Sequence, residues 1–110
     1  MPQSLRSMLG LAQKAGQAAS GEVAVEEALR KRRAYLLIVA EDASQRTRER
    51  LVELAAAASV PCYVVGTREE LGRALGKGHR AAVAITSAPF ANGITGILTR
   101  EGLAPVAGRG

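Results

Sequence analysis

Two short cationic segments carry the residues best suited to binding an anion. Arg30, Lys31, Arg32 and Arg33 stand in sequence, and residues 76–80 read Gly-Lys-Gly-His-Arg. A guanidinium group can bind a phosphate through two parallel hydrogen bonds. Glycines let the backbone of a turn approach a phosphate closely, so the second segment could clamp one. It lacks the glycine spacing and the Ser or Thr of a nucleotide-binding P-loop.

Both segments also have plainer interpretations. Four cations at the end of a helix would stabilise its dipole, although like charges in a row repel one another and exceed what the dipole needs. A glycine-rich turn with basic side chains can be an ordinary surface loop. The overall charge favours anion binding, because 15 Lys and Arg residues against 10 Asp and Glu residues give a net charge of +5. Genomic codon bias, which can enrich a protein in arginine, is the alternative explanation of this positive charge.

Other chemistry finds little support in the sequence. Cys62 is the only cysteine and His79 the only histidine, so one chain can form neither a disulfide nor a Cys/His metal site. Glu26 and Glu27 are adjacent and would point about 100° apart on a helix, which is poor geometry for a paired acid and base. No apolar stretch approaches the length of a membrane span, about 18 residues. We therefore expect a cytoplasmic protein without catalysis, cofactor, metal or membrane contact.

The elements that must position these residues follow from periodicity and capping signals. Helices are expected over residues 2–15, 20–33, 42–58, 67–76 and 87–100, and strands over residues 35–40, 62–65 and 81–86. Asp42 with Gln45 and Thr67 with Glu70 have the spacing of helix capping boxes. Cys62 is expected to be buried in its strand.

The order of these elements predicts the fold. Strands that alternate with helices indicate parallel crossovers and a sheet covered on both faces. We therefore expect an α/β fold, a three-layer α/β/α sandwich with a small mixed sheet of about four strands. A single domain should span residues 1–100, and residues 101–110 should form a flexible C-terminal tail. Sites in open sheets gather in loops beyond the strand ends, here residues 18–22, 41–44 and 76–80.

Several segments, taken in order, resemble a known family. They are LGLAQKAG at residues 9–16, SGEVAV at 20–25, AYLLIVAEDAS at 34–44, VPCYVVGTREELGRALGK at 60–77 and AAVAIT at 81–86. Over residues 5–98 the chain resembles the ribosomal L7Ae/L30e protein family, in particular its bacterial YlxQ-like branch. The resemblance implies an α/β/α sandwich that binds RNA, often at kink-turns, with no cofactor and no catalysis.

The resemblance also implies a location for RNA contacts. Kink-turn binders of the family open their second helix with a Gly-x-Asn-Glu-x-x-Lys stretch that reads tandem sheared G·A pairs. Gly21 matches the glycine, whereas Val23, Ala24 and Glu27 replace the Asn, Glu and Lys. The loop at residues 77–80 is basic, whereas in kink-turn binders it is mainly apolar and covers an extruded base. The missing triplet predicts weak binding to a standard kink-turn.

These observations lead to one expected function and one alternative. We expect a non-catalytic protein that binds structured RNA, ribosomal or otherwise non-coding, mainly through phosphates. The expected RNA-binding residues are Gly21, Glu22, Lys31, Arg32, Lys77, Gly78, His79 and Arg80. Specificity would then come from RNA shape, and the scarcity of aromatic residues argues against binding single strands by stacking. The alternative is a module that kept the fold, lost RNA recognition and binds ribosomal or transcription proteins.

Overall fold

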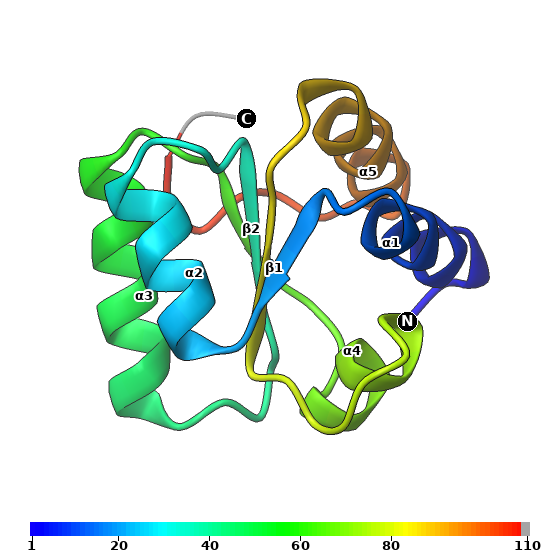
Figure 1. Ribbon diagram of the computed structural model, residues 1–110, viewed down its shortest axis with the longest axis horizontal. Coiled ribbons are helices and arrows are strands. Elements are labelled where there is room, and N and C mark those ends of the chain that lie inside the picture. Colours follow the sequence, from blue (N-terminus) through cyan, green and yellow to red (C-terminus); the bar gives the residue numbers. More distant parts are fainter. Residues whose placement is uncertain (109–110) are drawn as a thin grey trace.

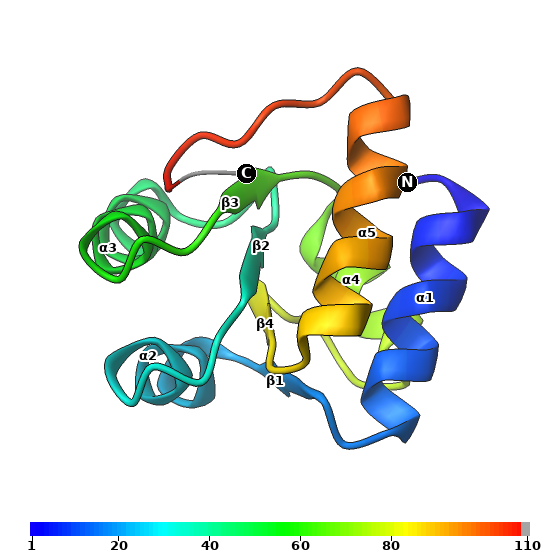
Figure 2. The same ribbon diagram turned by 90° about the horizontal axis from the view of Figure 1, so that it is seen from above.

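The structure, a computed structural model, describes residues 1–108 as three layers built around one sheet (Figure 1). In chain order the elements are α1 (Gln3–Lys14), β1 (Ala18–Ser20), α2 (Glu22–Arg30), β2 (Leu36–Val39), α3 (Gln45–Ala57), β3 (Cys62–Val64), α4 (Arg68–Ala74), β4 (Ala82–Ile85) and α5 (Ala88–Arg100). Helices α2 and α3 cover one face of the sheet, and α1, α4 and α5 cover the other (Figure 2). The predicted α/β/α sandwich is therefore confirmed.

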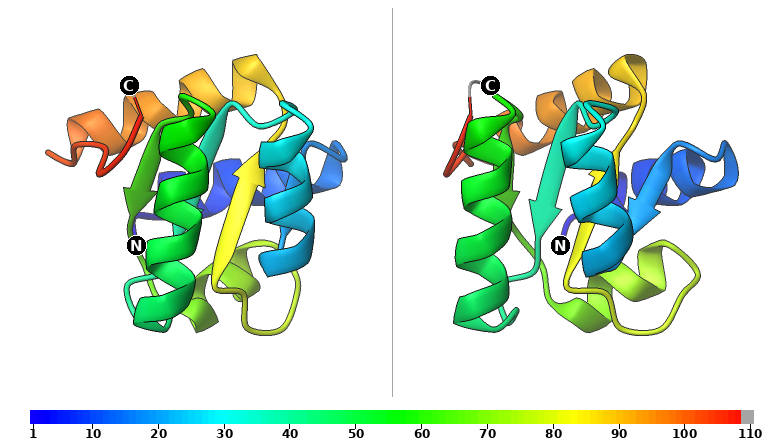
Figure 3. Two further views of the ribbon diagram at one scale, coloured as in Figure 1. Left: turned by 90° about the vertical axis from the view of Figure 1, so that its left-hand side faces the viewer. Right: turned by 60° about the vertical axis from the view of Figure 1, so that its left-hand side comes forward.

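The sheet is mixed and has four strands in the order β1-β4-β2-β3. β2 and β3 are parallel, whereas β4 runs antiparallel to both β1 and β2. The expectation of parallel crossovers is correct for β2 and β3 and wrong for β4. The reason is the shortness of α4: its seven residues do not carry the chain back along the sheet, so β4 starts at the end where β3 finishes (Figure 3).

β1 is the strand that the sequence does not reveal. The sequence predicts a loop over residues 18–22, but Ala18 pairs with Ile85 of β4 and Ser20 pairs with Val83. Alanine and serine have little strand preference, and three residues are too few to show an alternating pattern. Pairing with the buried β4 decides the conformation here, and it brings Ser20 to the end of the sheet where α2 begins.

Aliphatic side chains fill the space between the layers. β2 and β4 are buried along their whole length, and Cys62 in β3 is buried as predicted. Large side chains from the helices complete the core, among them Leu5, Leu9, Val25, Leu51, Leu71, Ile94 and Leu98. Burying one such side chain contributes about 1.5–3 kcal/mol, so the core fixes each helix on the sheet. Within residues 1–108, no helix is both long and apolar enough to span a membrane.

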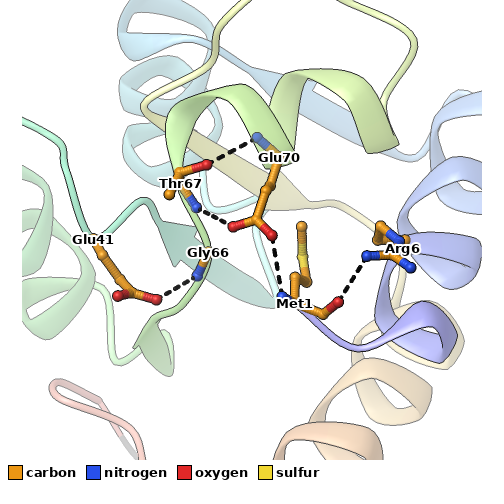
Figure 4. A network of polar contacts seen from close by, with 6 residues as sticks. All are labelled: Met1, Arg6, Glu41, Gly66, Thr67 and Glu70. Carbon is orange, nitrogen blue, oxygen red and sulfur yellow. Dashed lines mark hydrogen bonds and ion pairs between the residues drawn. The ribbon is translucent and has the colours of Figure 1, made fainter.

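A network of polar contacts holds the start of α4 (Figure 4). Thr67 and Glu70 form the predicted capping box, in which each side chain accepts a hydrogen bond from the amide of the other residue. The Glu70 carboxylate also accepts from the ammonium group of Met1 at 3.1 Å. The Thr67 amide and this ammonium group hold the pKa of Glu70 below its ordinary value. Glu41 accepts from the amide of Gly66 at 2.9 Å, which links the end of β2 to the same turn.

The start of α3 differs from the expectation. The predicted capping box of Asp42 with Gln45 is wrong: Ser44 caps α3, and its hydroxyl accepts from the Thr47 amide at 3.2 Å. Asp42 bonds elsewhere, since its Oδ1 accepts from the amide of Arg68 at 2.8 Å. A contact with a residue 26 positions away therefore outweighs the local capping signal, and it joins the starts of α3 and α4.

The basic loop between α4 and β4 packs closely on α4, and this packing requires a glycine. A Cβ on Gly72 would lie 2.0 Å from the carbonyl oxygen of Gly78. The amide of Lys77 donates to the Gly72 carbonyl at 2.7 Å, and the amide of Arg80 donates to the Arg68 carbonyl at 3.1 Å. Backbone contacts therefore set the path of this loop.

The chain after α5 returns to the sheet and lies beside β3. The amide of Cys62 donates to the carbonyl of Ala107 at 2.9 Å, and its carbonyl accepts from the amide of Val106 at 2.7 Å. The sequence predicts a flexible tail over residues 101–110, and the structure differs at these two docked residues, which cover the outer edge of β3. Residues 109 and 110 of the predicted tail lie outside the described residues.

Candidate functional site

Three helices begin at the same end of the molecule. α2 and α3 both start there, and α4 lies across this end together with the loop that leads into β4 (Figure 3). Between them lies an open groove of about 720 Å³. It is lined by Ser20, Gly21, Glu22, Val23, Ala24, Glu27, Ser44, Thr47, Arg68, His79, Arg80 and Ala81. We call this surface the α2 groove, because the first turns of α2 form most of one wall.

The N-terminus of α2 is open toward this groove. Gly21 precedes the helix with φ 92° and ψ 157°, a conformation that favours glycine. No side chain caps α2, whereas Ser44 caps α3 and Thr67 caps α4. The first amides of a helix have no partner within it and carry partial positive charge. The amides at the start of α2 are therefore suited to binding an anion in the groove.

Arg80 provides a positioned positive charge beside these amides. Its Nε donates to the Ser20 hydroxyl at 3.2 Å, and its Nη1 donates to the carbonyl of His79 at 3.0 Å. Among the described residues, Arg80 forms no salt bridge and its Nη2 has no acceptor. The guanidinium group is thus held in place by neutral partners, which leaves its charge available to a ligand.

Arg68 and His79 extend the basic wall of the α2 groove, and both are exposed. The Nε of Arg68 lies 3.6 Å from Oδ2 of Asp42, so part of its charge is already balanced. The Asp42 carboxyl has a lowered pKa, caused first by the hydrogen bond from the Arg68 amide. The basic wall therefore combines one free guanidinium, Arg80, with one that is partly neutralised.

Two carboxylates of α2 also line the groove, and each has a partner. Glu22 accepts from the hydroxyl of Thr47 on α3, and Glu27 accepts from the ammonium group of Lys31 at 2.9 Å. The hydrogen bond from Lys31 is the main cause of a lowered pKa at Glu27, which is therefore ionised at neutral pH. These contacts offset part of the negative charge beside the open helix end, although exposed pairs of this kind are weak.

The structure brings together half of the residues expected to bind RNA. Gly21, Glu22, His79 and Arg80 line the α2 groove. Gly78 contributes a carbonyl that accepts from Nη1 of Arg80 at 3.4 Å, which helps to orient that side chain.

The other expected residues lie apart from the groove or at its margin. Lys77 is exposed on the loop but does not line the groove. Lys31 and Arg32 follow the end of α2, about 15 Å along the helix axis from Gly21. Sequence reasoning missed Arg68 and Thr47. Arg68 directly follows Thr67, the predicted cap of α4. Its position at the turn between a strand and a helix could therefore have indicated that it lies near a site.

Residues suited to covalent or metal chemistry are not assembled in the described part of the chain. Within residues 1–108, no group of three or more His, Cys, Asp or Glu side chains is placed to hold a metal ion. Burial raises the pKa of the Cys62 thiol to about 12, so the thiol is protonated at neutral pH. Because the thiolate is the reactive form, Cys62 is a structural residue of β3.

Known proteins share both the sequence and the fold of this chain. Residues 3–93 match the family described as "Ribosomal protein L7Ae/L30e/S12e/Gadd45 family". A Bacillus subtilis protein named "RNA-binding protein YlxQ" is 38% identical over 91 residues, which are 83% of this chain and 91% of that protein. An Enterococcus faecium protein of the same name is 29% identical over 75 residues, which are 68% of this chain and 73% of that protein. A solved structure described as a protein with unknown function from Bacillus halodurans C has a TM-score of 0.85 and 32% identity, and the match covers 89% of this chain and 99% of that one.

Proposed function

Because the chain belongs to the ribosomal protein L7Ae/L30e/S12e/Gadd45 family, we propose that it is a non-catalytic RNA-binding protein that holds structured RNA at the α2 groove. The name of the two similar proteins, RNA-binding protein YlxQ, supports the RNA-binding part of this proposal. The main observation in favour of this site is the uncapped N-terminus of α2 beside Arg80. The first amides of α2 and the oriented guanidinium group of Arg80 border the same groove.

A phosphate in the α2 groove would accept hydrogen bonds from the first amides of α2 and from Arg80. Such charge-assisted bonds are roughly twice as strong as neutral ones. Ser20 and the loop carbonyls already hold Arg80 in place, so little side-chain freedom is lost when a phosphate binds. Lys77 and His79, both exposed on the loop, would add attraction to neighbouring phosphates.

The residues that replace the kink-turn triplet line this same groove, and their chemistry favours a different mode of recognition. Val23 is 81% exposed and offers no hydrogen-bonding group to a base. Ala24 offers none either, and the carboxylate of Glu27 repels phosphates. We therefore propose that the protein recognises RNA shape and backbone rather than the G·A pairs of a standard kink-turn.

One observation favours the alternative partner. The exposed side chain of Val23 lies in the α2 groove beside basic residues, a combination that would also suit an acidic segment of a ribosomal or transcription protein. The two proposals differ in a measurable way, because only RNA binding requires displacement of many condensed counterions.

The salt dependence of binding to a structured RNA tests the proposal. If about four phosphates are neutralised, log affinity should fall with log salt concentration with a slope of about −3 to −4. Replacing Lys77 and Arg80 together by Ala should weaken binding to every structured RNA and make the slope shallower by about two contacts. Because Arg80 also braces the loop, Lys77→Ala with His79→Ala provides a second variant.

The matched control for the Lys77 and Arg80 variant replaces Lys14 and Arg100 by Ala, which removes the same two charges from α1 and α5, and Lys14→Ala alone is the control for the Lys77 and His79 variant. Both controls should bind RNA almost as the wild type does. Tight binding with a slope near zero would refute the phosphate-anchored site. Equal losses in the controls and in the loop variants would show that only net charge matters, and failure to bind RNA with retained binding to an acidic protein partner would favour the alternative.

A further inference from the structure

The C-terminal end of α2 presents a surface that the α2 groove does not use. The four consecutive cations divide into two pairs here. Arg30 and Lys31 each contact a glutamate one turn earlier in α2, at 3.5 and 2.9 Å. Arg32 and Arg33 are exposed, and within residues 1–108 they form no salt bridge and no side-chain hydrogen bond. Two guanidinium groups therefore remain without a direct partner, although the charge of Arg33 contributes a little to the lowered pKa of Glu27.

The backbone holds these two arginines in a defined turn. Arg32 has φ 54°, in the left-handed region that glycine usually occupies at the end of a helix. Its amide donates to the Leu29 carbonyl at 3.2 Å, and the amide of Arg33 donates to the Ala28 carbonyl at 2.9 Å. Ser59 ends α3 in the same way, with φ 58°, so this conformation closes the helix and fixes where Arg32 and Arg33 leave α2.

An exposed aromatic ring follows directly on this turn. Tyr35 is 54% exposed, and its amide donates to the carbonyl of Ile85 at 2.8 Å, which fixes its backbone on β4. Among the described residues, the Tyr35 hydroxyl has no hydrogen-bond partner. The other tyrosine, Tyr63, is 2% exposed and belongs to the core. An exposed ring on a fixed backbone, two to three residues after free cations in the chain, offers the two kinds of contact, base stacking and phosphate binding, by which proteins hold single-stranded nucleic acids.

We propose that Arg32, Arg33 and Tyr35 form a second RNA-contact surface, which takes a single-stranded segment flanking the structured RNA held in the α2 groove. This inference rests on the proposed RNA-binding function. Gly21 and Arg32 lie 11 positions apart along α2, about 16 Å, so one RNA molecule can reach both ends of the helix. One exposed ring accommodates only one base, so stacking is limited to this position, and the scarcity of aromatic residues still argues against binding a longer single strand by stacking.

The chemistry of this surface favours RNA over a protein partner. It has two free guanidinium groups and one aromatic ring, whereas protein interfaces are built around a larger apolar centre. Arginine can pair with phosphate through two hydrogen bonds and can also stack on a base. A flanking strand would therefore gain affinity from both kinds of contact, while the stem stays in the α2 groove.

Two RNAs test this inference: a stem-loop, and the same stem-loop with a single-stranded extension of about ten nucleotides. The wild type should bind the extended RNA at least about fivefold more tightly, the effect of stacking one base. Tyr35→Ala should lose this gain, whereas Tyr35→Phe should keep it because the ring remains. Arg32→Ala with Arg33→Ala should also lose the gain. Lys14→Ala with Arg100→Ala has the same charge change on the other face of the sheet and should keep it.

A spectroscopic measurement locates the contact independently of affinity. Protein labelled with 3-fluorotyrosine gives two ¹⁹F signals, one from each tyrosine. The Tyr35 signal should shift with the extended RNA and stay unchanged with the stem-loop alone, while the buried Tyr63 serves as an internal control.

Each result bears on one proposal or the other. Equal affinity of the wild type for the two RNAs, or a gain that survives both Tyr35→Ala and the double arginine variant, would overturn the second surface and leave the groove intact. A gain without a shift of the Tyr35 signal would overturn the stacking contact. If the wild type binds neither RNA, the RNA-binding function itself is wrong.

Discussion

Reversing the charge of Glu27 should strengthen RNA binding, because this side chain lies on the wall of the α2 groove. Glu27 lines the α2 groove and its carboxylate is paired with Lys31 at 2.9 Å. Glu27→Lys removes a negative charge from the groove wall, adds a positive one, and frees the Lys31 ammonium group from its partner. All three changes favour a nearby phosphate.

The expected gain follows from Coulomb's law. In water, a unit charge about 6 Å from a phosphate interacts with an energy slightly above thermal energy. A change of two units at that distance corresponds to roughly a tenfold change in Kd at low ionic strength. The Debye length is about 8 Å at 0.15 M salt, which reduces the expected gain to roughly threefold.

Titrations of one stem-loop at low and at 0.15 M salt measure this gain. Glu101→Lys has the same charge change at the end of α5, away from the groove. It should lower log Kd by less than half of the decrease that Glu27→Lys causes. The variant Val23→Asn, Ala24→Glu and Glu27→Lys should in addition prefer a kink-turn to an unbent duplex. Nanomolar binding of the wild type to a kink-turn, or a triple variant without this preference, would show that the residue-by-residue comparison with kink-turn binders is wrong. Equal gains from Glu27→Lys and Glu101→Lys would refute the placement of RNA at this wall.

Three further predictions concern the framework that carries the site. Thr67→Ala removes one half of the capping box of α4 and should lower the free energy of unfolding by about 1 kcal/mol in urea titration, whereas an unchanged value would show that the box is dispensable. The Glu70 carboxyl has a lowered pKa in the fold, so the ionised carboxylate stabilises the protein above its ordinary pKa of 4.5, and this stabilisation is lost as the pH falls. Glu70→Gln should therefore reduce the loss of stability between about pH 5 and pH 3. A pH profile of stability identical to that of the wild type would contradict this. The Cys62 thiol, with its pKa raised to about 12, should react with a thiol reagent at pH 8 only on unfolding, and rapid reaction of the folded protein would contradict its burial.

The parts of the fold that were predictable from sequence have local signals. The capping box of Thr67 and Glu70 can be recognised from four consecutive residues, and the buried strands β2 and β4 appear as continuous apolar runs. β1 has no such signal, because Ala18–Ser20 becomes a strand only through pairing with β4. The cap of α3 was mistaken for a similar reason, since Asp42 bonds to Arg68 and leaves the cap to Ser44.

The candidate site was predictable in its residue types and only partly in its geometry. The glycines and cations of the loop at residues 76–80 are visible in sequence. The position of His79 and Arg80 in the groove that Gly21 lines depends on the close packing of Gly72 against Gly78. Arg68 was missed because nothing local links it to the loop. The separation of Arg32 from Gly21 follows from helix geometry alone, since 11 positions at about 1.5 Å each place them at opposite ends of α2.

The location of bound RNA tests the central claim most directly. Titration of ¹⁵N-labelled protein with a structured RNA, followed through the backbone amide signals, reports which residues the RNA contacts. The account predicts that the largest shifts occur at residues 21–24 and 77–81, while the exposed residues of α1 and α5, such as Leu11 and Arg100, change little. Shifts centred on α1 and α5, with the amides of residues 21–24 unchanged at saturation, would contradict it.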